Sequence, residues 1–125
     1  MDVIQQYTEL SKKIATLLPL KALPVRDLVQ TFRSEGHPIT LKTQLNVTAV
    51  MNSGDSSGIV CMVETDDGIK MGCPLTYLVF AGDTPLYKDI THYQVNRIKR
   101  VLMLQKAGVK QSFNTLKTKS RFDKS

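Results

Sequence analysis

The 125-residue chain contains no tryptophan, only two cysteines, and 6 % aromatic residues. Two cysteines are too few for the disulfide framework of a small secreted domain. No stretch approaches the roughly 18 consecutive apolar residues of a membrane-spanning helix. The opening residues, MDVIQQYTELSKK, lack the basic segment followed by an apolar one that marks a secretory signal. These absences predict a cytoplasmic protein with reduced thiols and no membrane partner.

The composition that is present fits one small globular domain with a basic end. Hydrophobic residues make up 42 % of the chain, which is enough for a core, and the net charge is +6. Ten of the 17 lysines and arginines lie between Lys88 and Ser125, against two aspartates. We expect a domain over residues 1 to 108 and a flexible basic tail over 109 to 125. Such a charge distribution favours a polyanionic partner.

Apolar residues spaced three and four apart predict two helices near the start of the chain. The first covers residues 2 to 18 and the second about 24 to 34, with Pro19 and Pro24 bracketing a short connector. The apolar stripe of the first helix packs on its own domain or pairs two copies. A homodimer through residues 2 to 18 is therefore an alternative.

Residues 40 to 51, TLKTQLNVTAVM, change to an alternating pattern. Leu45, Val47, Ala49 and Met51 fall on one face of this segment. Its threonines and valines favour a strand, and a helix is the alternative. A helix here would favour a DNA-binding arrangement, whereas a strand makes RNA or a protein partner the better expectation.

Residues 65 to 69, TDDGI, predict a three-residue hairpin loop with Gly68 in the left-handed conformation. This register places Cys61 opposite Cys73, Val63 opposite Met71, Ile59 opposite Leu75, and Glu64 opposite Lys70. The cysteines then face the core as small hydrophobic residues. Residues 76 to 80, TYLVF, either extend the last strand or form a fourth.

The stretch NSGDSSG, residues 52 to 58, resembles the loop that presents the nucleophilic serine of chymotrypsin-like proteases. Such a protease needs a histidine base, an orienting aspartate and two barrels. No aspartate lies between His37 and Asp55, and the chain is too short for two barrels. Turn-forming residues account for the stretch instead. The histidines and cysteines also lack paired metal-ligand spacing, so we expect no catalytic residue, metal or cofactor.

The longest predicted helix covers residues 85 to 107, with Thr84 as its cap, and ends at Gly108. Its apolar face contains Leu86, Tyr87, Ile90, Tyr93, Ile98, Val101 and Leu104. Arg97 and Gln94 fall inside this face, where an arginine extends its head to water or requires a polar partner. The opposite face and the tail supply the residues that we expect to bind nucleic acid: Lys88, His92, Lys99, Arg100, Lys106, Lys117, Lys119 and Arg121.

Together these patterns predict an α+β fold. Two N-terminal helices precede a three- to four-stranded antiparallel meander, and a long helix follows. The order is similar in outline to winged-helix domains and to small SH3-like barrels, and carries no diagnostic motif of either. We expect a non-enzymatic protein that binds DNA or RNA or has a regulatory role. The alternative is a protein-interaction or assembly module, homodimeric through residues 2 to 18. The expected partner is DNA or RNA, or else an acidic protein surface.

Overall fold

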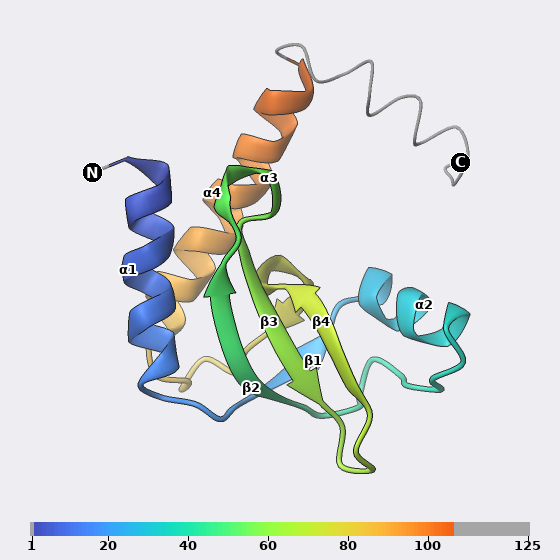
Figure 1. Cartoon of the computed structure of the whole chain (residues 1–125). Coiled ribbons are helices and arrows are strands. Elements are labelled where there is room, and N and C mark those ends of the chain that lie inside the picture. The colour runs from blue at the N-terminus through green and yellow to red at the C-terminus, as the bar shows by residue number, and fades with distance from the viewer. Residues whose placement is uncertain (1, 107–125) are drawn as a thin grey trace. The chain divides into compact units, whose positions relative to one another are not determined.

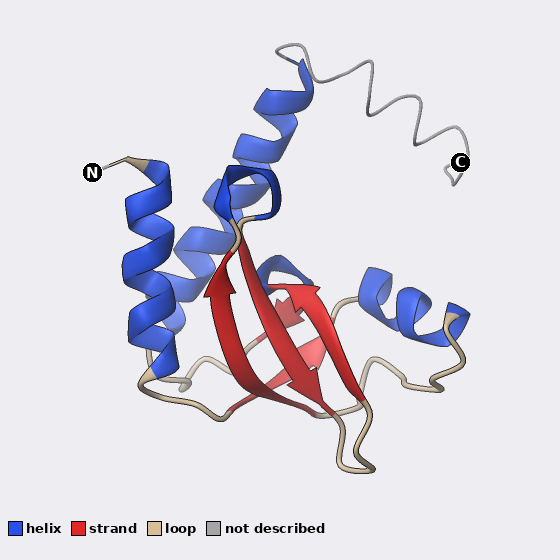
Figure 2. Ribbon diagram, in the orientation of Figure 1, coloured by secondary structure: helices blue, strands red, loops and turns tan. Residues whose placement is uncertain are grey.

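The computed structural model describes residues 2–106, and the chain divides into two compact units between His92 and Tyr93. The first unit contains α1 (Val3–Ala15), β1 (Leu20–Pro24), α2 (Arg26–Ser34), β2 (Leu45–Asn52), α3 (Gly54–Ser57), β3 (Ile59–Glu64), β4 (Lys70–Pro74), a 3₁₀ helix (Leu75–Tyr77), β5 (Leu78–Val79) and the start of α4 (Tyr87–Leu104) (Figures 1 and 2). The remainder of α4 belongs to the second unit. The two units are described separately.

The sheet of the first unit is antiparallel and curled, with the strand order β4-β3-β2-β1-β5 (Figure 1). The α+β class and the meander of β2, β3 and β4 are as predicted. The number of strands is five rather than three or four. One additional strand, β5, lies within residues 76 to 80, where a fourth strand was one of two expectations. The other, β1, lies where we expected a connector.

The strand β1 shows why two prolines misled the sequence interpretation. Leu20, Ala22 and Pro24 are buried and alternate with exposed residues, as in a strand with one face on a core. β1 pairs with β2 through Leu20 and Val47 and with β5 through Leu23 and Val79. Pro19 precedes β1 and Pro24 is its last residue, so neither proline interrupts the strand.

The strand predicted within residues 40 to 51 is confirmed as β2, but the set of side chains predicted to share one face is only partly correct. Leu45 and Val47 are 0 % and 1 % exposed, whereas Met51 is 59 % exposed. The pairing with β3 shifts between Val47 and Ala49. One extra residue in a strand reverses the faces of all later side chains. The helix that supported the winged-helix likeness and the preference for DNA is absent from this segment.

The hairpin register between β3 and β4 is confirmed. Cys61 pairs with Cys73, Val63 with Met71, and Glu64 with Lys70. The Thr65 N–H donates to the carbonyl oxygen of Ile69 at 2.9 Å, and Gly68 has a φ of +90°, in the left-handed region. Ile59 and Leu75 are both 0 % exposed. Leu75, however, lies in the 3₁₀ helix after β4 ends, and the ladder closes at Val60 and Pro74.

Hydrogen bonds stabilise the first helix at its N-terminus and attach it to β2. The Asp2 side chain accepts a hydrogen bond from the Gln5 N–H at 2.8 Å, as part of a capping box. The Asn52 side chain donates to the Ile4 carbonyl at 3.1 Å and to Thr8 Oγ1 at 2.8 Å, which holds α1 beside β2. Tyr7 and Ile14 are buried. The apolar stripe of α1 thus serves the core of its own unit.

The fourth helix begins later than predicted. Thr84, Pro85 and Leu86 form a turn, and α4 starts at Tyr87. Leu86 has a φ of +63°, a conformation that bulky side chains rarely adopt. The Tyr87 N–H donates to the Thr84 carbonyl at 3.0 Å. Ile90, one turn further, is fully buried. The predicted end at Gly108 lies outside the described residues.

Candidate binding surface

The serine-rich stretch forms the connection between β2 and β3. Residues Gly54–Ser57 are a single helical turn, α3, and Ser56 is exposed. The Asn52 side chain accepts from the Gly54 N–H at 2.9 Å, and the Ser53 N–H donates to the Gly58 carbonyl at 2.8 Å. Gly54 and Gly58 both have positive φ angles. The need to reverse the chain therefore accounts for these residue types.

The two cysteines are free and belong to the core. Cys61 is 1 % exposed and Cys73 is 3 % exposed. The pKa of both thiols is raised to about 12, mainly by burial, with a smaller contribution at Cys61 from the neighbouring Cys73. Such thiols are poor nucleophiles and poor metal ligands at neutral pH. Within residues 2–106 no group of three or more His, Cys, Asp or Glu side chains is placed to hold a metal ion.

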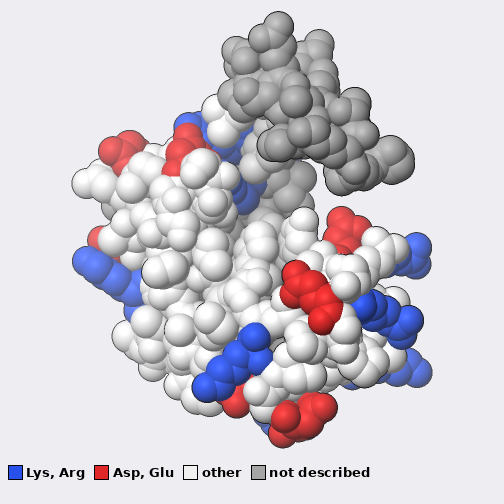
Figure 3. Space-filling view, turned by 45° about the vertical axis from the view of Figure 1, so that its right-hand side comes forward, with Lys and Arg blue, Asp and Glu red and all other residues white. Residues whose placement is uncertain are grey.

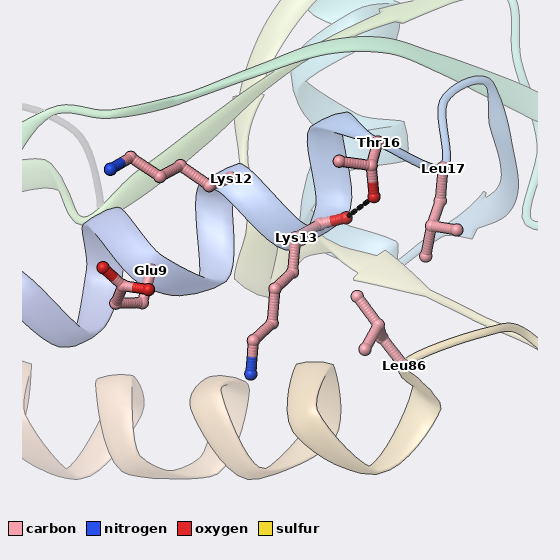
Figure 4. Close-up of a pocket in the computed structure, with 6 residues that line it drawn as sticks. All are labelled: Glu9, Lys12, Lys13, Thr16, Leu17 and Leu86. Carbon is pink, nitrogen blue, oxygen red and sulfur yellow. Dashed lines mark hydrogen bonds between the residues drawn. The ribbon is translucent and has the colours of Figure 1, made fainter.

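A shallow open groove of about 380 Å³ lies beside the C-terminal end of α1. Its lining residues are Glu9, Lys12, Lys13, Thr16, Leu17 and Leu86. Figure 4 shows Lys12 and Lys13 extending in different directions, so their ammonium groups do not converge on one point. The Thr16 hydroxyl donates to the Lys13 carbonyl at 2.7 Å. The groove thus has scattered charges and an apolar end, and lacks the convergent polar groups of a ligand site.

The basic residues predicted on α4 are mostly where the sequence placed them. Lys88, His92, Lys99 and Lys106 are exposed, whereas Arg100 is half-buried. Arg97 is 6 % exposed, so of its two alternatives the one in which its head extends to water is wrong. Gln94 is half-buried. The remaining predicted residues, Lys117, Lys119 and Arg121, lie outside the described part of the chain.

An exposed apolar row on α4 was missed. Ile98, which we expected on the buried face, is 52 % exposed, as are Val95 and Leu102, and Met103 is 64 % exposed. The buried or half-buried row consists instead of Ile90, Tyr93, Arg97, Val101 and Leu104. The spacing of Val95, Ile98 and Leu102, three and then four residues, was visible in the sequence. Assigning Ile98 to the buried face, between Tyr93 and Val101, concealed it.

The second unit therefore presents apolar and basic residues side by side. We call the exposed face formed by Val95, Ile98, Lys99 and Leu102 of α4, together with Lys106 just beyond its end, the outward face of α4. At 100° per residue Lys99 lies next to the apolar row, and Lys106 follows in the π-helical turn after Leu104. This combination can bury apolar surface and offer ammonium groups to a partner at the same time. It contains no carboxylate or nucleophile that could support catalysis.

The surroundings of the sheet differ from this face. Figure 3 shows a broad uncharged area, with acidic and basic side chains interspersed around its border rather than gathered by sign.

No described helix is long and apolar enough to cross a bilayer. Comparisons with protein-family models, with curated proteins and with solved structures find no match to this chain.

Proposed function

We propose that this protein is a non-enzymatic protein-interaction module that binds its partner through the outward face of α4. The observation that carries the proposal is the exposed apolar row. Of the ten large hydrophobic side chains that are exposed among the described residues, four lie from Val95 to Met103, and three of these, Val95, Ile98 and Leu102, belong to the outward face of α4. Burying one such side chain fully is worth about 1.5–3 kcal/mol. Apolar side chains gathered in this way mark interaction surfaces, whereas single scattered ones need no explanation.

The fold is compatible with this role. The strand order and the 3₁₀ helix between β4 and β5 resemble the arrangement of small SH3-like barrels. A likeness at the level of fold does not specify a partner. The likeness is consistent with a scaffold that holds helices and loops in place, and the surface residues determine the partner.

Nucleic-acid binding is the second candidate, and the exposed basic side chains favour it. Lys88, His92, Lys99 and Lys106 are exposed along α4, where they could contact phosphates. Protein–nucleic acid interfaces are, however, more polar and much more positively charged than protein–protein interfaces. Three of the five residues of the outward face of α4 are apolar, which weakens this candidate relative to the first.

Site-specific photocrosslinking in the native cell extract separates the two candidates. With benzoylphenylalanine in place of Ile98, we expect a discrete protein adduct that resists nuclease treatment. The matched control places the same group at Gln30, which is exposed on α2 and should give no such adduct. Both positions face solvent, so stability should change by no more than about 0.5 kcal/mol. A nuclease-sensitive adduct at Ile98 would support the nucleic-acid candidate, and equal yields at both positions would contradict a specific surface.

A further inference from the structure

We infer that the partner of the outward face of α4 is an acidic amphipathic helix. This inference rests on the proposed function, since it assumes that the face binds a protein. Two features of the second unit support it: the spacing of the exposed apolar residues and the sign of the charges beside them. Each points to one property of the partner.

The apolar spacing indicates a helical partner. Val95, Ile98 and Leu102 occupy successive positions a, d and a of a heptad pattern, and each is 52 % exposed. An a and d row presents knobs that fit the holes on the surface of another helix. The segment from Val95 to Lys106 covers about three helical turns. A partner helix of similar length would cover the whole row.

The flanking charges indicate that the partner is acidic. Lys99 is exposed and occupies position e, directly beside the apolar row, and Lys106 is exposed in the π-helical turn after Leu104, where continuation of the heptad gives position e again. The corresponding g positions hold Gln94 and Val101, which are uncharged and half-buried. From Gln94 to Lys106 the sequence contains no Asp or Glu. In helix pairs the e and g residues determine which partner is accepted, and here every exposed charge beside the row is positive.

A second copy of the chain does not satisfy this arrangement. Antiparallel pairing of two outward faces brings position e against position e, and so lysine against lysine. Parallel pairing brings Lys99 against Gln94 and Lys106 against Val101, with no opposite charge gained. A nucleic acid would meet the lysines but would leave the apolar row without a complement. A helix with Leu at a and d and Glu beside them meets both requirements.

The test uses the full-length protein and three synthetic helical peptides of about 21 residues, a length that favours helix formation. All have Leu at positions a and d, and their e and g positions hold Glu, Gln or Lys. We expect the Glu peptide to bind roughly fivefold or more tightly than the Gln peptide in fluorescence anisotropy, as two exposed ion pairs allow. The Lys peptide should bind most weakly. The preference should largely disappear near 1 M salt, where charges are screened beyond about 3 Å.

Two variants locate the binding. Ile98→Ser should weaken all three peptides, because it removes the central apolar contact. The double variant Lys99→Glu and Lys106→Glu should reverse the order, so that the Lys peptide binds most tightly. Retention of the Glu preference in the double variant would overturn the inference, as would equal binding of the Glu and Gln peptides to the wild type.

Two further results separate this inference from the function on which it rests. A dimer seen by sedimentation at micromolar concentration and lost in Ile98→Ser would make the occupant a second copy, and would overturn the acidic helix. If crosslinking at Ile98 gives a nuclease-resistant protein adduct but the three peptides bind equally, the proposed interaction function is supported and the acidic helix is refuted. Absence of that adduct would contradict both the proposed function and this inference.

Discussion

Replacing Phe32 with alanine is expected to lower the free energy of unfolding by about 3–5 kcal/mol. Phe32 is 0 % exposed, and with Leu28 and Val29 it forms the buried side of α2. Its ring also meets that of His37 edge-on, with centroids 6.3 Å apart. Truncation removes the transfer free energy of the ring and leaves a cavity. Since small domains are stable by only about 5–15 kcal/mol, this single change should remove a large share of the stability of the first unit.

Equilibrium unfolding in urea measures this loss, with Gln30→Ala as the matched control. Gln30 is exposed on the same helix, so its substitution should change stability by no more than about 0.5 kcal/mol. Phe32→Leu should fall between the two, because leucine refills part of the space. A loss below about 1 kcal/mol for Phe32→Ala, with an unchanged denaturant slope, would show that α2 contributes little to the core.

The second large effect is kinetic and concerns the paired cysteines. Burial raises the pKa of Cys61 and Cys73 from 9.0 to about 12. Only the thiolate reacts with alkylating reagents. At pH 8 the native thiols should therefore react roughly a thousandfold more slowly than an exposed thiol, from the pKa alone. Mass spectrometry after timed iodoacetamide treatment measures the rate, and urea should restore fast labelling. Rapid native labelling of both thiols would contradict their burial.

The same thiols make stability depend on alkaline pH. The folded state keeps them neutral up to about pH 12, whereas the unfolded state ionises them near 9.0. Below pH 9 this contribution to stability is fully present, and it is lost as the pH rises from 9 towards 12. A double variant with Cys61→Ala and Cys73→Ala should lose less stability over that range than the wild type. All other titratable groups are the same in both proteins, so the comparison cancels their contribution.

The sequence predicted best what local chemistry decides. The Gly68 turn determines its own conformation and thereby the register of β3 and β4, so the positions of Cys61 and Cys73 followed from a few adjacent residues. The exposure of Lys88 and Lys99 followed equally directly from helical periodicity.

Features that depend on distant partners could not be predicted in this way. β1 is a strand because β2 and β5 pair with it from either side, and neither is its neighbour in sequence. The bulge near Thr48 depends on the pairing of β2 with β3, so Met51 was assigned to the wrong face. On α4 the burial of Arg97 contradicts its usual preference for solvent. The sequence also assigned Ile98 to the buried face, although it is 52 % exposed, and so missed the apolar row of the candidate binding surface.

The strand order also has a consequence for how the first unit folds. β2, β3 and β4 are joined by short connections, so their ladders can form with little loss of chain entropy. The pairing of β1 with β5 joins Leu23 to Val79 and must close a loop that contains the whole meander. We therefore expect the transition state to contain the β3–β4 hairpin and to lack the β1–β5 ladder. In φ-value measurements Val63→Ala should mainly slow folding, whereas Leu78→Ala should mainly accelerate unfolding.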